Sequence, residues 1–355
     1  MLQKTFNITS LVRPHILSLK PYTSARDEYS GKNGTFLDAN ENPFGSVNGE
    51  AFNRYPDPLQ KAVKQKLAAI KKVNPAQIFL GNGSDEAIDL LFRAFCEPQK
   101  DKVLTLPPTY GMYQVSAAIN QVEVVEVPLT ASFQLDTNAI FSFLEREKAV
   151  KVIFICSPNN PTGNQLDLVA IENVLYHFNG LVVVDEAYID FAMYPSLIKL
   201  LDRFPNLVVL QTFSKAWGMA ALRMGMAFTH PEIIHILNKI KPPYNISQLT
   251  QEKVLAALDS DTKRAEKVKI LIALRQDLAA NLKALPIIKK VYPSDANFLL
   301  IKVDNAKQMY NALIQKLVIV RDRSSVKLCD NCLRITVGTK EENSKLIAAI
   351  NEVSQ

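Results

Sequence analysis

The chain has 355 residues, of which 48% are hydrophobic and 21% charged, and its formal net charge is +6. This composition is that of an ordinary globular protein, and the length favours two or three domains. The basic residues are scattered, so nucleic-acid binding is not expected, although a mild positive charge suits small anionic substrates. No run of about 18 apolar residues occurs, so no membrane span is expected. Residues 1–19 lack the apolar core of a secretory signal, which favours a cytoplasmic location.

The segment from residue 57 to residue 228 alternates between helical and strand-like patterns. Leu59, Val63 and Leu67 recur with helical spacing, whereas the strand-like segments are short continuous apolar runs. Helices are expected over 57–72, 86–95, 110–120, 139–147 and 168–178, and strands over 78–80, 102–106, 123–127, 152–156, 181–184, 207–210 and 224–228. Apolar strands separated by helices predict a doubly wound, mostly parallel α/β sheet that is covered on both faces.

The pattern changes after about residue 248, where 248–285 reads as one long helix or two abutting helices. Further elements are expected: a strand over 298–303, a helix over 305–316, strands near 317–321 and 333–337, and a final helix over 341–353. These elements predict a smaller α+β domain. We therefore expect an N-terminal arm over 1–50, a large domain over 51–245 and a small domain over 246–355. The arm is expected to pack across the site or on a neighbouring chain.

Polar residues directly follow several of the predicted strands. In an open parallel sheet, ligands bind beyond the carboxyl ends of the strands. The segments concerned are 81–86, 108–110, Asn160, 185–188 and 214–215. Because they come from well-separated parts of the chain and meet at one edge of the sheet, we expect them to form one ligand site.

Lys215 and Asp185 indicate the kind of ligand. Lys215 follows the apolar run 207–210, and Asp185 ends the apolar run 181–184. Most lysines are solvated surface residues, but a lysine and a carboxylate at two strand ends suit pyridoxal 5′-phosphate. A lysine amine holds that cofactor covalently, and a carboxylate keeps its ring nitrogen protonated. We predict that Lys215 binds the cofactor and moves a proton as general base, that Asp185 faces the ring nitrogen, and that Tyr188 contacts the ring hydroxyl oxygen.

The turn Gly81-Asn82-Gly83-Ser84-Asp85-Glu86 is either a phosphate cradle at a helix start or an N-capped turn without a ligand. It matches neither the nucleotide P-loop nor the dinucleotide fingerprint, and without a P-loop the acidic strand end at 185–186 does not indicate an NTPase. Arg223, together with Thr212 and Ser214, is predicted to hold the cofactor phosphate, because arginine binds phosphate through two parallel hydrogen bonds.

Two arginines of the second domain are candidates for binding an anionic substrate. Arg334 interrupts the apolar strand 333–337. It is either an exposed residue on one face of the strand or a ligand for a substrate anion in the cleft between the domains. Arg321 is a second candidate, although a local ion pair with the neighbouring Asp322 explains it equally well.

Glu186 and a cysteine pair have plainer interpretations. Glu186 is expected to be an outward-facing structural carboxylate. Cys329 and Cys332 have the spacing of half a zinc site, but no second pair of cysteines or histidines accompanies them. We interpret them as two thiols in a surface turn and expect no metal. Four cysteines in total are too few for a disulfide scaffold.

Several motifs together resemble the fold-type I, class I and II aminotransferases, which use pyridoxal 5′-phosphate. The motifs are Asn160-Pro161-Thr162-Gly163, Asp185-x-x-Tyr188, Ser214-Lys215 and Arg223 eight residues later. Longer blocks are similar to the histidinol-phosphate aminotransferases within that family, at 37–45, 53–57, 107–113, 156–163 and 333–338. The resemblance covers nearly the whole chain.

The resemblance implies fold type I of the pyridoxal-phosphate-dependent transferases and a role for each matching residue. The cofactor would be surrounded by Ser84, Asp85, Tyr110, Asn160, Asp185, Tyr188, Thr212, Ser214, Lys215 and Arg223. Tyr110 would stack on the ring. Tyr55 would reach the cofactor phosphate of the other subunit, which makes the active unit a homodimer with shared active sites. Arg334, helped by Arg321, would hold the substrate anion, and Tyr22 and Asn160 would line the substrate pocket.

The implied activity is transfer of the amino group of L-histidinol phosphate to 2-oxoglutarate in L-histidine biosynthesis, with imidazole acetol phosphate and L-glutamate as products. One alternative is a broad or aromatic-amino-acid aminotransferase. Another is a pyridoxal-phosphate-dependent decarboxylase of an O-phospho amino acid. A ligand-sensing domain of a transcription regulator is disfavoured, because Lys215 is present and the segment before the first matching block is too short for a DNA-binding module.

Overall fold

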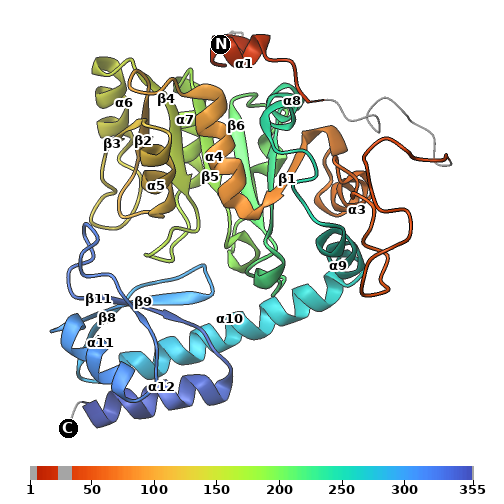
Figure 1. Ribbon diagram of the computed structural model, residues 1–355. Helices are drawn as coiled ribbons and strands as arrows, with labels where there is room; N and C mark the ends of the chain where they lie inside the picture. Colours follow the sequence, from red (N-terminus) through yellow and green to blue (C-terminus); the bar gives the residue numbers. More distant parts are fainter. Residues whose placement is uncertain (1–5, 23–33, 354–355) are drawn as a thin grey trace.

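The computed structural model describes residues 6–22 and 34–353. Its large domain contains a seven-stranded sheet with the order β1-β7-β6-β5-β4-β2-β3 (Figure 1). The strands are β1 (Ile78–Asn82), β2 (Lys102–Thr105), β3 (Glu123–Glu126), β4 (Val150–Cys156), β5 (Leu181–Asp185), β6 (Leu207–Thr212) and β7 (Met224–Thr229). β7 runs antiparallel to both of its neighbours, and the other pairings are parallel. The predicted doubly wound, mostly parallel sheet is therefore confirmed.

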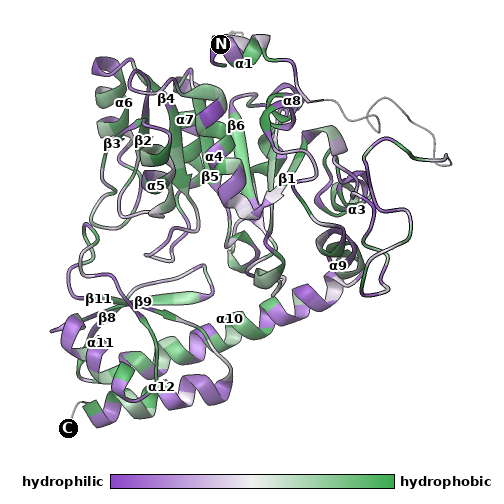
Figure 2. Ribbon diagram, viewed as in Figure 1, coloured by the Kyte–Doolittle hydropathy of each residue, from purple (hydrophilic) through white to green (hydrophobic). Residues whose placement is uncertain are grey.

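Alternate residues of the central strands feed two cores, one on each face of the sheet. In β4, Val152 and Phe154 pack into one core, and Ile153 and Ile155 pack into the other. The first core is closed by α4 (Gly83–Phe95), α5 (Met112–Ile119) and α8 (Pro231–Ile240), and the second by α6 (Thr137–Arg146) and α7 (Leu168–His177). The large-sheet strands are accordingly mostly hydrophobic (Figure 2), since both faces are removed from water.

The small domain is a four-stranded antiparallel sheet with helices packed on it. Its strand order is β10-β11-β9-β8. The elements are α10 (Asp261–Lys283), β8 (Ile288–Val291), β9 (Phe298–Val303), α11 (Ala306–Gln315), β10 (Arg321–Asp322), β11 (Cys332–Thr336) and α12 (Lys340–Val353). The strand expected near 317–321 begins later than predicted and covers only Arg321–Asp322. Leu317 has a φ of 58°, so the chain turns there and β10 begins only at Arg321.

The segment 248–285 forms two helices rather than one. α9 (Gln248–Leu258) packs on α3 (Lys61–Lys71) and buries Val254 and Leu258 in the large domain. α10 then runs from the large domain to the small sheet (Figure 1). α9 packs on the large domain, whereas α10 packs on the sheet of the small domain. The domain limits at 50 and 245 stay predictions. Within the two described stretches, every helix is too short or too polar to cross a membrane.

The N-terminal arm is anchored at one end. Ile8, Val12 and Ile16 are buried in the core that contains α4 and α8, with Ile16 in the short helix α1 (Pro14–Ser18). The later part of the arm instead carries exposed apolar side chains, namely Leu37, Phe44 and Val47. Such a concentration of exposed apolar groups is typical of a surface that another chain covers. Residues 1–5 and 23–33 of the predicted arm lie outside the described residues.

Glu186 is buried, so the expected outward-facing position is wrong. Its side chain is 2% exposed and accepts three hydrogen bonds. The donors are the Ser196 hydroxyl at 2.5 Å, the Leu197 N–H at 2.7 Å and the Gln211 amide at 2.9 Å. Gln211 belongs to β6, while Ser196 and Leu197 precede it in the chain. The carboxylate therefore ties the end of β5 to β6 and to the segment between them.

The surface-turn interpretation of Cys329 and Cys332 is also wrong. The two residues are 0% and 1% exposed and pack with residues of the large-domain core, Phe133 among them. A turn joins them, in which the Cys332 N–H donates to the Cys329 carbonyl at 3.0 Å. Burial raises the pKa of Cys329 to about 12 and raises that of Cys332 as well. In the described part of the chain, no three His, Cys, Asp or Glu side chains are grouped to hold a metal ion.

Glu186→Ala should destabilise the protein by about 3 kcal/mol, because three buried donors lose their acceptor. Urea unfolding of the ligand-free protein measures this loss. Glu172→Ala is the matched control, since Glu172 pairs with Arg203 at 2.8 Å on the surface and should cost below about 1 kcal/mol. Equal losses in the two variants would contradict a structural role for the Glu186 network.

Candidate active site

The predicted site residues lie at the carboxyl edge of the parallel strands. Asp185 is the last residue of β5, and Lys215 lies in the turn that follows β6. The ring of Tyr188 lies beside them, with its centroid 5.6 Å from the Lys215 amine. The small domain contributes Arg334 of β11, which donates a hydrogen bond to Asn160. The structure thus brings these five residues together from both domains.

The Asp185 carboxylate is buried and held by two hydrogen bonds. Its side chain is 3% exposed. Oδ2 accepts from the Tyr113 hydroxyl at 2.9 Å, and Oδ1 accepts from the Ala187 N–H at 3.0 Å. Burial raises the pKa of Asp185 from 3.8 to about 6, and the two hydrogen bonds act in the opposite direction. A cation placed beside this carboxylate would stabilise its charged form, which is the role predicted for it.

Tyr113 is a site residue that the sequence reasoning missed. It is fully buried on α5, where its ring stacks on Phe154 at 4.7 Å and meets the edge of Tyr110 at 5.5 Å. This packing fixes the hydroxyl that orients Asp185. Its sequence signal is weak: Tyr113 lies one helical turn after Tyr110, at a position whose neighbours predict an apolar core residue rather than a hydrogen-bond donor.

Lys215 is exposed, yet its surroundings lower the pKa of its amine. Loss of hydration is the main cause, and the positive charge of Arg334 adds to it, while the Asp185 carboxylate opposes both. A lower pKa leaves more of the amine neutral, which is the form that acts as a nucleophile or base. The turn itself is fixed by the Gly218 N–H, which donates to the Lys215 carbonyl at 3.0 Å.

The first turn of α4 and Arg223 form a cradle. Gly83 has a φ of 72°, and a Cβ at this position would lie only 2.7 Å from Nη2 of Arg223. The positive φ favours glycine here, and a side chain at this position would have to displace the Arg223 guanidinium. The N–H groups of Ser84 and Asp85 belong to the first turn, which has no acceptors within the helix and attracts anions. The cradle can accept a phosphate group.

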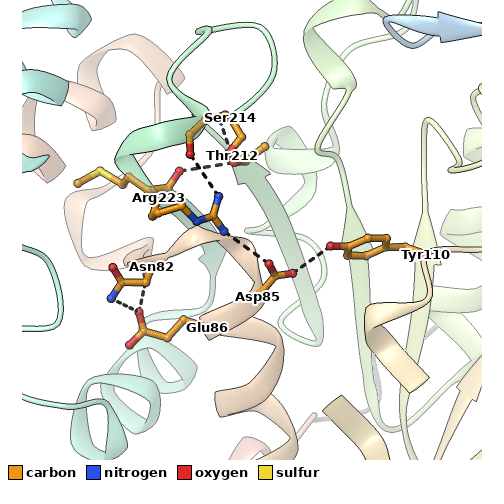
Figure 3. A network of polar contacts seen from close by, with 9 residues as sticks. Asn82, Asp85, Glu86, Tyr110, Thr212, Ser214 and Arg223 are labelled. Atoms are coloured by element: carbon orange, nitrogen blue, oxygen red, sulfur yellow. Dashed lines mark hydrogen bonds and ion pairs between the residues drawn. The ribbon is translucent and has the colours of Figure 1, made fainter. Parts of the chain in front are cut away.

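The side chains around this cradle are connected (Figure 3). Nη2 of Arg223 lies 3.7 Å from the Asp85 carboxylate, whose Oδ1 accepts from the Tyr110 hydroxyl at 3.3 Å. The Thr212 hydroxyl accepts from the Ser214 N–H at 3.0 Å. All five residues were predicted from the sequence to surround the cofactor, and the structure brings them to the same end of the sheet. Asp85 contributes its side chain as well as its place at the helix start.

Asn160 and Arg334 connect the two domains. Nη1 of Arg334 donates to Oδ1 of Asn160 at 2.5 Å, and the guanidinium lies 5.3 Å from the centroid of the Phe298 ring. Asn160 is 7% exposed, and its neighbour Asn159 donates to the Pro108 carbonyl at 2.8 Å, which fixes the turn. The Arg334 guanidinium is therefore aimed at the edge of the large sheet rather than at solvent.

Arg321 stands directly opposite Arg334 in the β10–β11 pair and is exposed. The Asp322 carboxylate accepts from the N–H and the hydroxyl of Ser324, at 2.8 and 2.6 Å. An Arg321–Asp322 pair is not among the ion pairs of residues 34–353. The register therefore places Arg321 where it can help Arg334 with an anion.

Tyr55 and Tyr22 line a different pocket from the cluster around Lys215. Tyr55 stacks on Tyr244 with ring centroids 4.5 Å apart, and Tyr22 is 73% exposed. Both line one pocket together with Asp38 and Tyr244. Their expected contacts, with another subunit's cofactor and with substrate, stay predictions.

Asp185→Asn should change the pH dependence of stability in the ligand-free protein. Because the folded pKa exceeds the unfolded value, native Asp185 holds its proton more tightly between about pH 4 and pH 6. The wild type therefore loses about 3 kcal/mol as the pH rises through this window, and the variant does not. The unfolding free energy of the variant minus that of the wild type should rise by this amount between about pH 4 and pH 7.

Urea unfolding at a series of pH values measures this difference. Asp304→Asn is the matched control, because the Asp304 side chain is 71% exposed and the substitution removes the same charge from the surface. A difference for Asp185→Asn that does not change with pH would show that its carboxylate is not desolvated.

The chain is similar over nearly its whole length to known aminotransferases. A model of the class I and II aminotransferases matches residues 29–350. A histidinol-phosphate aminotransferase of Cytophaga hutchinsonii is 55% identical over 96% of this chain and 98% of that protein. Another, from Christiangramia forsetii, is 53% identical over 99% of both. The crystal structure of histidinol-phosphate aminotransferase from Sinorhizobium meliloti in complex with pyridoxal-5'-phosphate shares the fold, with a TM-score of 0.77 at 24% identity and 89% of each chain covered. This chain belongs to the family of class I and II aminotransferases.

Proposed function

We propose that the protein is a pyridoxal-phosphate-dependent transaminase acting on L-histidinol phosphate and 2-oxoglutarate, with imidazole acetol phosphate and L-glutamate as products. The observation that carries the proposal is the meeting of Lys215 and Asp185 with Arg334 of the small domain at one edge of the sheet. Relatives at 52–55% identity over nearly the full length bear the name histidinol-phosphate aminotransferase. The reaction is a step of L-histidine biosynthesis.

Pyridoxal 5′-phosphate is the cofactor of this family, and the residues present fit it. The glycine cradle beside Arg223 suits its phosphate, and the buried Asp185 suits a cationic ring nitrogen. When bound, the cofactor supplies a ring that accepts electrons from the reacting carbon of the substrate. The residues proposed to hold it are Ser84, Asp85, Tyr110, Asn160, Asp185, Tyr188, Thr212, Ser214, Lys215 and Arg223.

The catalytic work of the chain is the placement of charges and protons. Asp185 would keep the ring nitrogen protonated, because a cation beside its carboxylate offsets the cost of burial. The Lys215 amine, with its lowered pKa, would act as the general base that removes a proton from the reacting carbon of the substrate. Tyr188, 8% exposed and close to Lys215, would shield this side from water and contact the ring hydroxyl oxygen.

The substrate anion is assigned to Arg334, with Arg321 beside it. Asn160 orients the Arg334 guanidinium through a 2.5 Å hydrogen bond. The planar guanidinium accommodates both a carboxylate and a phosphate through paired hydrogen bonds. The same site therefore receives L-glutamate or 2-oxoglutarate in one half-reaction and the phosphate group of histidinol phosphate in the other.

The active unit proposed is a homodimer with shared active sites, in the cytoplasm. Its support is the arm, where Phe44 is 94% exposed and Leu37 is 87% exposed, so apolar surface lies uncovered in a single chain. Tyr55, which belongs to the same part of the chain, is half exposed and would extend towards the partner's cofactor phosphate.

The substrate is tested by mixing the purified holoenzyme with L-histidinol phosphate, L-phenylalanine or O-phospho-L-threonine, each without a keto acid. The visible absorbance of the bound cofactor should fall rapidly with histidinol phosphate and far more slowly with phenylalanine, because phenylalanine lacks the phosphate group and the imidazole ring of histidinol phosphate. Comparable loss with phenylalanine would make the enzyme a broad aminotransferase. Release of carbon dioxide from O-phospho-L-threonine would make it a decarboxylase.

Lys215→Ala should lower turnover by at least about a thousandfold, because both the covalent attachment and the general base are removed.

Tyr55→Phe should weaken cofactor retention, whereas Tyr176→Phe, a change to another exposed tyrosine, should not. Mixing Lys215→Ala with Tyr55→Phe chains should restore activity at limiting cofactor, since each heterodimer holds one intact site. Absence of any restoration would contradict shared active sites.

A further inference from the structure

Arg323 lies on the same face of the β10–β11 hairpin as the two substrate arginines. Arg321 is opposite Arg334, and Asp322 is opposite Leu333. The ladder continues for one more residue, since the Arg323 N–H donates to the Cys332 carbonyl at 2.9 Å. Successive residues of a strand point to opposite faces, so Arg321 and Arg323 share the face of Arg334.

The packing of the neighbours agrees with this assignment of faces. Leu333 belongs to the core of the small domain, whereas Cys332 packs with the core of the large domain. The side chain of Arg323 is therefore directed towards the large domain. Its backbone is held in place by the buried turn that ends at Cys332.

The guanidinium of Arg323 is not neutralised within residues 34–353. Its Nε is buried without a hydrogen-bond partner. Burial lowers the pKa of Arg323, and the positive charges of Arg334 and then Arg321 lower it further, while Cys329 and then Tyr188 act in the opposite direction. The register of the hairpin places Arg323 two residues from Arg321 on the face of Arg334, so the three positive charges lie on the same side of the sheet. None of the ion pairs formed by described residues involves any of the three arginines.

We propose that Arg323 is a third arginine of the substrate pocket and binds the phosphate monoester of the amino donor. This inference rests on the proposed function, in which Arg334 binds a carboxylate in one half-reaction and a phosphate group in the other. A buried donor without a partner is costly, and a phosphate oxygen would satisfy it. Arg323 then distinguishes the two anions, because it is needed for only one of them.

The charges of the two anions explain the distinction. A phosphate monoester carries a charge of about −1.5 to −2 at pH 7 and has three acceptor oxygens, whereas a carboxylate carries −1 and has two. Arg334 and Arg321 together are sufficient for a carboxylate. The third guanidinium has an acceptor only when a third oxygen is present. Arg323 is therefore a specificity-determining residue rather than a group that acts on the reacting carbon.

The test compares the two amino donors in the holoenzyme. With Arg323→Gln, kcat/KM for L-histidinol phosphate should fall by about tenfold to a hundredfold, chiefly through KM, since one charge-assisted contact is lost. The same parameter for L-glutamate should stay within about twofold. Arg323→Lys keeps the charge without the planar fork and should recover part of the loss. If Arg323→Gln fails to fold, Arg323→Lys provides the same comparison of the two donors.

Lys327→Gln is the matched control. Lys327 lies in the same loop and carries the same charge, but it faces Glu126 of the large domain at 3.7 Å. Its removal should leave both donors unaffected. Equal losses for the two donors in Arg323→Gln, or equal losses in Arg323→Gln and Lys327→Gln, would overturn the proposal.

Inhibition by methyl phosphate separates this inference from the proposed function. Methyl phosphate should inhibit the reaction of the wild type with L-glutamate, and Arg323→Gln should raise its inhibition constant while leaving that of acetate unchanged. If the wild type reacts with glutamate but not with histidinol phosphate, the proposed function fails, and the methyl phosphate result still decides the role of Arg323. An unchanged inhibition constant would remove Arg323 from the anion site.

Discussion

The Asp185 carboxylate is buried at the end of β5, and the rest of the site depends on how its charge is stabilised. Burial raises its pKa, the hydrogen bonds from Tyr113 and the Ala187 N–H offset part of that rise, and the resulting pKa is about 6. In the proposed function, a cationic ring nitrogen would complete the stabilisation. The doubly wound sheet makes this arrangement possible, because β5 is flanked by parallel strands that remove the carboxylate from water while leaving the strand end open.

The small domain contributes to the site through one side-chain contact, between Arg334 and Asn160. Arg334 reaches the edge of the large sheet and is oriented there by Asn160. Its positive charge also contributes to the lowered pKa of Lys215, so the substrate site and the reactive amine are electrostatically coupled. Binding of an anion at Arg334 would partly neutralise that charge and make the amine a stronger base. In the proposed function, Arg334 and Lys215 would thereby link substrate recognition in one domain to proton transfer in the other.

Much of the fold and the site could be predicted from the sequence, because the signals were local. Apolar strands separated by helices gave the sheet, and Lys215 and Asp185 were recognisable from their places after such strands. Other features depend on partners far away in the chain. Glu186 is buried because Ser196 and Gln211 supply donors, and Tyr113 reads as core until its hydroxyl is seen on Asp185. Cys329 and Cys332 are buried by the other domain, which no local pattern reveals.

The protonation of Asp185 with and without cofactor tests the central claim most directly. Carbon-13 resonances of labelled aspartate can be followed as a function of pH, with the Asp185 signal assigned by its absence in Asp185→Asn. The account predicts that Asp185 titrates near pH 6 in the ligand-free protein and stays ionised well below that pH when pyridoxal 5′-phosphate is bound. Titration near pH 4 in the free protein, or no change on adding cofactor, would contradict it.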